Sequence, residues 1–201
     1  MRKRTATVKR ESRETAVTII CCLDGYGQAK LDQPVGFLGH LLTALAKHSR
    51  FDLTVTARGD TEVDDHHLCE DLGLTLGRAL RLAWSSTAGL CRFGQALVPM
   101  DDALALVVVD ISGRPYLAWD ATLPGQWVGN FEAELVPEFL RALAQEAGIT
   151  VHVRLLAGRN THHILEAVFK ALGLALRQAT RTDAELDGVQ SSKGEVKWLA
   201  Q

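Results

Sequence analysis

The chain has 201 residues, of which 47% are hydrophobic, and its 22 basic and 24 acidic residues give a formal net charge of −2. This length and apolar content are enough for one core of ordinary size, or for two halves that share a core. The balanced charge indicates neither a nucleic-acid-binding surface nor a membrane-binding one.

The first half of the chain predicts alternating strands and helices. Residues 1–14 are polar and charged, and we expect them to be extended or partly ordered. β-Branched residues predict a buried strand at 15–23, and alternating apolar residues predict a half-buried strand at 51–57. Apolar residues at helical spacing predict helices at 36–50 and 66–84.

The second half of the chain repeats this order. It predicts strands at 103–111, 116–122 and 149–155, and helices at 134–147 and 162–180. The tail, residues 182–201, is polar, and we expect it to be mobile. The leucine- and alanine-rich run at 42–46 aligns with 140–144, so the regions of about 1–94 and 95–181 form an internal duplication. We therefore expect a single α+β domain in which helices pack against sheets.

Cysteine usage and the lack of a long apolar run bear on the compartment. The four cysteines, at positions 21, 22, 69 and 91, fit neither a disulfide framework nor a Cys-x-x-Cys metal site. The run at 16–23 is too short to span a membrane, and no signal-peptide cleavage pattern follows it. We expect reduced thiols in a cytoplasmic protein.

One motif, His-His-x-x-Glu, occurs twice, at the start of each second helix. Its residues are His66, His67, Glu70, His162, His163 and Glu166. A histidine and a carboxylate three or four positions apart lie on one helix face, and adjacent histidines point about 100° apart, so a pair can serve two metal ions. A single pair is better explained as a solvated helix start, but two copies in register favour a metal site.

Each half also carries a ligand-type residue on its first helix. These residues are His40 and Glu138, which correspond in the alignment of the halves. Eight ligand-type side chains suit two metal ions of high coordination number. Mixed nitrogen and oxygen ligands favour Mn or Fe over tetrahedral Zn, although Zn remains open.

Motifs along nearly the whole chain resemble those of a known family, the imidazoleglycerol-phosphate dehydratases of histidine biosynthesis. They include Gly36-Phe37-Leu38-x-His40, Asp64-Asp65-His66-His67-x-x-Glu70-Asp71, Arg92-Phe93-Gly94, Asp110-x-Ser112-Gly113-Arg114-Pro115, Gly158-Arg159-Asn160-x-His162-His163-x-x-Glu166 and Ser191-Ser192-Lys193-Gly194. The resemblance implies a duplicated fold like the second domain of ribosomal protein S5. It implies two Mn²⁺ ions per active site, no organic cofactor, and sites at the subunit interfaces of a cubic 24-subunit homo-oligomer.

The resemblance also assigns roles to individual residues. The implied metal ligands are His40, His66, His67, Glu70, Glu138, His162, His163 and Glu166, and the implied catalytic residue is Glu14. The implied substrate contacts are Glu14, His40, His48, Arg92, Arg114, Lys170, Ser191, Ser192 and Lys193. The chain departs from the family pattern at Gly39, Asp102 and Gln190, and at Glu138, where many members have histidine.

The implied substrate is an imidazole ring that carries a glycerol phosphate, and the implied reaction removes water from it. Two metals on the ring nitrogens would favour the imidazolate, whose electrons can expel the hydroxyl; a carboxylate, Glu14, would then move a proton. Without the resemblance, Glu14 is as well explained as a solvated charge, and Lys170 as an i, i+4 ion pair worth about 0.3–0.5 kcal/mol. A dinuclear metal-dependent hydrolase and a non-catalytic module assembled by metal remain alternatives.

Overall fold

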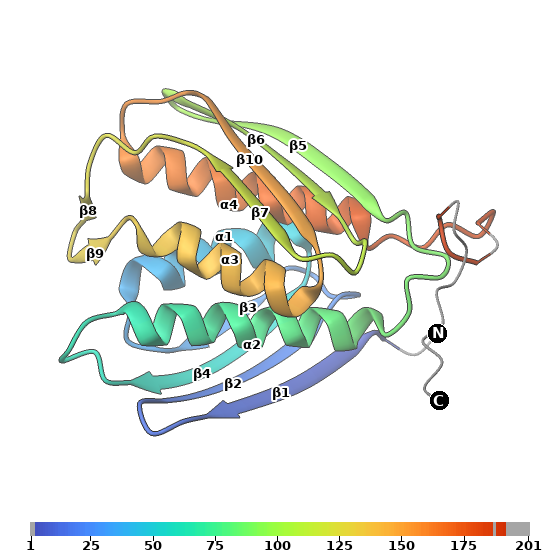
Figure 1. The fold of residues 1–201 in the computed structure, drawn as a ribbon, viewed down its shortest axis with the longest axis horizontal. Coiled ribbons are helices and arrows are strands. Elements are labelled where there is room, and N and C mark those ends of the chain that lie inside the picture. Colours follow the sequence, from blue (N-terminus) through green and yellow to red (C-terminus); the bar gives the residue numbers. More distant parts are fainter. Residues whose placement is uncertain (1–2, 187, 192–201) are drawn as a thin grey trace, which may run out of the picture.

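A computed structural model describes residues 3–186 and 188–191, and within these residues four helices lie between two four-stranded sheets (Figure 1). The first unit comprises β1 (Thr5–Glu11), β2 (Thr15–Cys22), β3 (Ala29–Asp32), α1 (Gly36–Ser49), β4 (Asp52–Gly59) and α2 (His66–Trp84). The second comprises β5 (Phe93–Met100), β6 (Ala103–Asp110), β7 (Tyr116–Asp120), α3 (Leu135–Ala147), β10 (Thr150–Ala157) and α4 (Thr161–Ala179). A small hairpin, β8 (Trp127–Val128) and β9 (Phe131–Glu132), precedes α3.

The two sheets have the same topology. The first is ordered β1-β2-β4-β3 and the second β5-β6-β10-β7. In each sheet, the first two strands form a hairpin, and the second strand also pairs antiparallel with the third strand in the sheet order (β4 or β10). The last strand in the order, β3 or β7, is short and runs parallel to its neighbour. The predicted duplication and the α+β class are therefore confirmed, and β5 begins within two residues of the expected boundary near 94/95.

The predicted helices and central strands agree with the structure to within two residues at most ends, and the helix expected at 66–84 is found at His66–Trp84. Five of the described strands were not predicted: β1, in a region expected only to be extended or partly ordered, and β3, β5, β8 and β9. β3 has only four residues, and β8 and β9 have two each. β5 contains Gly94 and Pro99, which weaken a strand signal, and it can accommodate the proline because it lies at the sheet edge.

Helices of one unit pack against helices of the other. α1 lies beside α4, and α2 lies beside α3. Glycines allow the close approach: a Cβ atom at Gly73 would lie 2.5 Å from the carbonyl oxygen of Phe139, and one at Gly173 would lie 2.8 Å from that of Leu45. The two units thus share one buried core, built mainly from leucine, valine and alanine.

The outer faces of the two sheets differ although their topology is the same. On β2 and β4, the outward positions include Thr18, Thr54 and Thr56. On β6, the outward positions are Leu104, Leu106, Val108 and Asp110, and Leu97 on the adjacent β5 is 55% exposed. The outer face of the first sheet is therefore the more polar of the two, although it includes Ile20, which is 40% exposed. That of the second sheet is the more apolar, although it includes His152 and Arg154 on β10.

The described part of the tail folds back on the segment between α2 and β5. Thr182 forms a β-bridge with Leu90, and the amide N–H of Gly89 donates to the carbonyl of Gly188. The mobility of the tail stays a prediction, and residues 192–201 lie outside the described part. In the described residues all four cysteines are free thiols, and no helix is long and apolar enough to cross a membrane.

Candidate metal centre

Three of the predicted ligands converge at the interface between α1 and α4. The Nε2 atoms of His40 and His162 each lie 3.3 Å from Oε2 of Glu166. One possible ligand atom from each of the three residues lies within 4.8 Å of the others. Because His40 comes from the first unit and the other two from the second, both halves of the chain contribute to this cluster, although the His-His-x-x-Glu motif of the first half takes no part in it.

Packing of α1 on α4 orients the two imidazole rings. Their centroids lie 5.3 Å apart, and the ring of Phe37 lies 5.0 Å from that of His162 and 6.0 Å from that of His40. α4 begins at Thr161, where the Asn160 side chain accepts a hydrogen bond from the backbone N–H of His163. The capped first turn thus fixes the position of the motif on the helix.

The carboxylate of Glu166 is the buried member of the cluster, with 9% of the residue exposed. Burial alone would raise its pKa, but hydrogen bonds from Lys170 and His40 outweigh this effect and leave the pKa below its ordinary value. The Lys170 ammonium lies 2.9 Å from Oε1 of Glu166, which leaves Oε2 facing the two imidazoles. Glu166 is therefore held as a carboxylate, the form that binds a cation.

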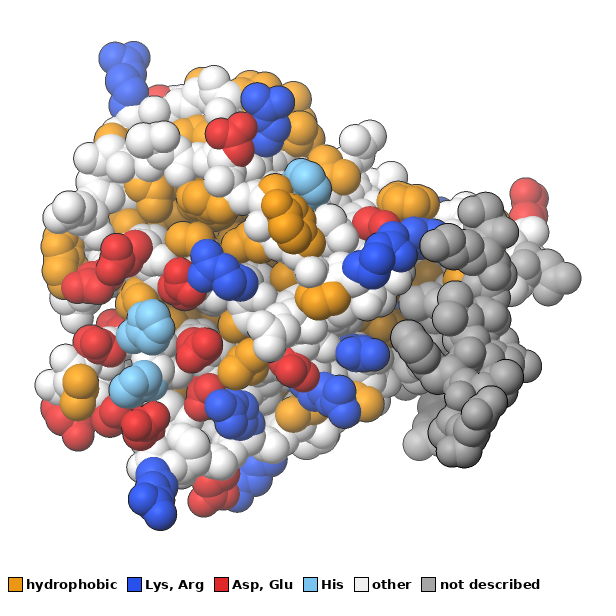
Figure 2. Space-filling view, viewed as in Figure 1, with side chains coloured by type: hydrophobic (Ala, Val, Ile, Leu, Met, Phe, Trp, Pro, Cys, Tyr) orange, Lys and Arg blue, Asp and Glu red, His pale blue; other side chains and the backbone are white. Residues whose placement is uncertain are grey.

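The corresponding residues of the first motif do not form a second cluster within the described residues. His66 and Glu70 are exposed at the start of α2, and Glu138 on α3 pairs with Arg141 of its own helix. Gly73, which lies one turn after Glu70 on α2, packs against Phe139, the residue that follows Glu138 on α3. Figure 2 shows histidine side chains among acidic ones at the end of the molecule where α2 begins.

The two histidine rings of each motif are nearly perpendicular, and the second histidine lies next to an aspartate. The angle between the ring planes is 89° for His66 and His67 and 81° for His162 and His163. Nδ1 of His67 lies 3.0 Å from Oδ2 of Asp60.

Nδ1 of His163 lies 2.6 Å from Oδ1 of Asp102, while its Nε2 lies 3.5 Å from Asp101. The hydrogen bond from His163, followed by one from the backbone of Arg159, holds the pKa of Asp102 well below its usual range. The sequence did not indicate these contacts of Asp60, Asp101 and Asp102 with the histidines. Only the folded hairpin and turn bring them to the histidines.

Glu14 lies in the turn between β1 and β2. Its side chain is 59% exposed, and Oε2 lies 3.9 Å from Nδ1 of His67. The base of this hairpin is fixed to α2 by the buried carboxylate of Asp71, which accepts hydrogen bonds from Arg10 at 2.9 Å and from the hydroxyl of Thr15. Glu14 is therefore an accessible carboxylate on a firmly anchored turn.

His48 and Lys170 lie beside the metal cluster. A Cβ atom at Gly173, on the turn of α4 that follows Lys170, would lie 3.0 Å from Cβ of His48. Burial, and then the nearby charge of Lys170, lowers the pKa of His48. Lys170 also lies 3.1 Å from the sulfur of Met100. His48 therefore lies near Lys170, which pairs with Glu166 of the cluster.

The other predicted cations gather at the opposite end of α4. Arg92 donates to Asp110 at 2.7 Å and to the carbonyl of Gln190, and Arg114 lies 3.7 Å from Asp110. The backbone N–H of Arg92 donates to the carbonyl of Ala179, the last residue of α4, whereas His162 lies in its first turn. At 1.5 Å per residue this separation is roughly 25 Å.

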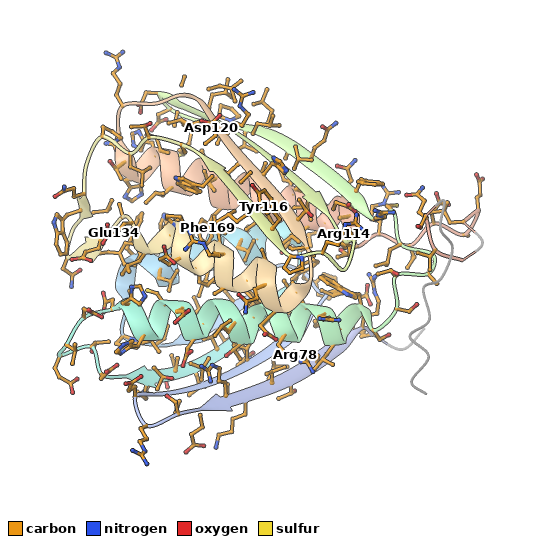
Figure 3. All side chains as sticks on the ribbon, viewed as in Figure 1. Arg78, Arg114, Tyr116, Asp120, Glu134 and Phe169 are labelled. Carbon is orange, nitrogen blue, oxygen red and sulfur yellow. The ribbon has the colours of Figure 1, made fainter. Side chains whose placement is uncertain are left out.

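In Figure 3, Arg114 lies near the end where the tail folds back, and Glu134, just before α3, lies at the opposite end of the molecule. Of the predicted tail contacts, Ser191 is the last described residue of the chain, and Ser192 and Lys193 lie outside the described residues.

At three positions where the chain departs from the family pattern, the structure shows which neighbouring group the residue contacts or leaves room for. Gly39 leaves room for Gln33, since a Cβ atom there would lie 2.5 Å from Nε2 of that side chain, which hydrogen-bonds Val35. Gln190 contacts Arg92 through its backbone carbonyl, an atom that any residue provides. Asp102 reaches His163 directly, as described above.

The chemistry of the cluster fits a divalent transition metal. Two imidazole nitrogens and a carboxylate oxygen suit such an ion, and three protein ligands leave positions open for water or substrate.

Comparisons with known proteins identify the family. The model of the imidazoleglycerol-phosphate dehydratase family matches residues 33–176. The imidazoleglycerol-phosphate dehydratase of Desulforudis audaxviator is 56% identical over 193 residues, which is 96% of this chain and 98% of that one. That of Halorhodospira halophila is 52% identical over 195 residues, or 96% and 99% of the two chains.

Two crystal structures are similar in fold. The enzyme from Staphylococcus aureus has a TM-score of 0.81 at 40% identity and covers 89% of this chain and 99% of its own. The enzyme from Pyrococcus furiosus, in complex with (S)-C348, has a TM-score of 0.81 at 39% identity and covers 94% and 100%. The chain therefore belongs to the imidazoleglycerol-phosphate dehydratase family, the hydro-lyases of histidine biosynthesis.

Proposed function

We propose that this dehydratase depends on a divalent metal, Mn²⁺, with two ions per complete active site and no organic cofactor. The convergence of His40, His162 and Glu166 from both halves of the chain carries this proposal. The second ion would be held by the matching set His66, Glu70 and Glu138, with His67 and His163 as further ligands. To bind this ion, Glu138 would have to exchange its ion pair with Arg141 for coordination of the metal.

The reaction converts D-erythro-imidazole-glycerol phosphate to imidazole-acetol phosphate and water. The hydroxyl leaves the carbon next to the ring, a proton leaves the following carbon, and the resulting enol becomes the ketone. When bound, the metal ions would supply Lewis acidity and a template for the imidazole ring. Glu14 would carry the proton, because it is an exposed carboxylate near His67 that is not part of the ligand cluster.

Other residues of the chain would bind and orient the substrate. His48 and Lys170 border the metal cluster and would contact the substrate there, whereas Arg92 and Arg114 have the planar donors that suit a phosphate. Ser191, Ser192 and Lys193 would complete the phosphate site.

The roughly 25 Å along α4 between the residue that contacts Arg92 and His162 exceeds the length of the substrate. The phosphate site of one chain would therefore serve the metal site of another, which supports a homo-oligomer such as the 24-subunit assembly. We place this assembly in the cytoplasm, with a small-molecule substrate and no nucleic-acid or membrane partner.

The test is a dehydratase assay on the purified protein after chelation and after readdition of Mn²⁺. We expect imidazole-acetol phosphate to form only with metal, and the mass in solution to increase when metal is added, because ligands drawn from several chains make the ion a cross-link. Full turnover in protein shown to be free of metal would refute the metal dependence. Release of inorganic phosphate would indicate a hydrolase, and absence of any turnover with metal bound would indicate a structural metal.

A further inference from the structure

We propose that Asp60 and Asp102 are positioning residues that hold His67 and His163 in the tautomer protonated on Nδ1, so that Nε2 is free to bind metal. This inference rests on the proposed metal dependence and extends it to two residues outside the ligand set. It also explains why Glu14 and Asp102, which occupy the same place in the two halves, do not share a role.

Asp102 is tightly held and has a single orientation toward His163. It lies in the turn between β5 and β6, where its Oδ2 accepts the backbone N–H groups of Arg159, at 2.5 Å, and Asn160, at 3.1 Å. Its Oδ1 lies 2.6 Å from Nδ1 of His163. An ionised carboxylate only accepts hydrogen bonds, so Nδ1 of a neutral His163 must carry the proton and Nε2 the lone pair.

Asp60 makes the corresponding contact in the first half. It follows β4 directly, its side chain is 20% exposed, and its Oδ2 lies 3.0 Å from Nδ1 of His67. Its Oδ1 is buried and has no hydrogen-bond partner among the described residues. Among the described residues, the side chain of Asp60 therefore hydrogen-bonds His67 alone. The same argument then predicts that a neutral His67 carries its proton on Nδ1.

The duplication shows that the two contacts arose at different positions. Glu14 precedes β2 directly, and Asp102 precedes β6 directly, so the two are counterparts. Yet Glu14 lies 3.9 Å from Nδ1 of His67, beyond hydrogen-bonding distance. The counterpart of Asp60 is Gly158, which has no side chain. The first half therefore orients its histidine from the turn after β4, which leaves Glu14 free to act on substrate.

The substitution Asp102→Asn tests the inference directly. Asparagine has one oxygen, which the two backbone N–H groups would retain, so its NH₂ group would face Nδ1 of His163. A donor at this place requires Nδ1 to accept, which moves the proton to Nε2. Long-range ¹H–¹⁵N correlation spectra of the metal-free, histidine-labelled protein should show this change at His163. Calorimetric titration should show Mn²⁺ affinity lowered about 10–100-fold.

Two controls separate positioning from folding. Asp60→Ala removes the acceptor from Nδ1 of His67 and should lower the fraction of His67 that is protonated on Nδ1. Asparagine is unsuitable at this position, because among the described residues no backbone N–H group would hold its oxygen away from the histidine. Asp120→Asn, which alters an exposed carboxylate paired with Arg154, should leave both tautomers and Mn²⁺ affinity unchanged.

Unchanged tautomers in both Asp60→Ala and Asp102→Asn would overturn the inference. So would loss of Mn²⁺ from either variant without a tautomer change, because the aspartate would then only support its loop. The tautomer is measured without metal or turnover, so this result is independent of whether the protein proves to be metal-dependent.

Discussion

Nε2 of His40 lies 3.3 Å from the carboxylate of Glu166, although the two residues belong to different halves of the chain. This contact exists only because α1 of the first unit packs along α4 of the second. The candidate metal centre is thus a product of the way the two repeats are joined, and it can be tested through either partner.

Removing a ligand from the cluster should release metal. We expect His162→Ala and Glu166→Gln each to lower the amount of Mn²⁺ that remains bound after gel filtration, measured by elemental analysis, and to lower activity in parallel. His152→Ala is the matched control, because His152 is exposed on β10 and is not among the predicted ligands; its ring lies 6.2 Å from that of Tyr116. Normal metal content in both cluster variants would show that the metal binds elsewhere.

Glu14→Gln should leave metal binding intact but lose turnover. The substitution preserves the shape of an exposed side chain and removes its ability to transfer a proton, so kcat should fall about 10²–10⁴-fold. Substrate affinity should change little, because the lost interaction belongs to the transition state. A variant with nearly normal kcat would identify Glu14 as a surface charge and assign the proton transfer to another group.

Asp71→Asn should weaken both the fold and the position of Glu14. Arg10 and Thr15 would lose a charged acceptor that is 8% exposed, which should lower the free energy of unfolding by about 2 kcal/mol. The comparison is Asp32→Asn, whose exposed pair with Arg58 should contribute less than about 1 kcal/mol. Urea denaturation of metal-free protein at one concentration measures both. Equal stabilities would mean that the hairpin does not depend on Asp71.

The helix contact between α2 and α3 should not tolerate a methyl group at Gly77. A Cβ atom there would overlap the carbonyl oxygen of Leu143, so Gly77→Ala should cost about 1–3 kcal/mol despite the higher helix propensity of alanine. At Gly36, the first residue of α1, a Cβ atom would meet nothing within 4 Å. Gly36→Ala should therefore be neutral or slightly stabilising in the same denaturation experiment.

The proposed homo-oligomer should use the apolar outer face of the second sheet. Leu106 on β6 and Thr18 on β2 are counterparts, both half-buried and directed outward from the centre of their sheets. We expect Leu106→Glu to lower the mass measured by light scattering, because a second copy would cover this face, whereas Thr18→Glu should not. The opposite pattern would place the contact between copies on the first sheet.

The sequence predicted the helices that carry the two His-His-x-x-Glu motifs well. It did not predict the edge strand β5 or the side chains that contact the histidines. Both His-His helices were placed within one residue at their starts, because capping residues precede an uninterrupted apolar stripe. The edge strand β5 was missed because Gly94 and Pro99 obscure its pattern. The contacts of Asp60 with His67 and of Asp102 with His163 depend on turns that close only in the folded chain, and no local signal marks them.

The packing of α1 on α4 and of α2 on α3 has a consequence for the ancestry of the chain. A polypeptide of one half alone would carry a His-His-x-x-Glu helix with no neighbouring helix to supply the third ligand. Two such polypeptides related by a twofold axis would form two identical ligand sets. Once the halves are fused, each set can change without the other, and here it has: His40 completes one set, while Glu138 stands at the corresponding place in the other. Fusion of two such halves would thus turn two identical sets of ligand-type residues into two sets that differ.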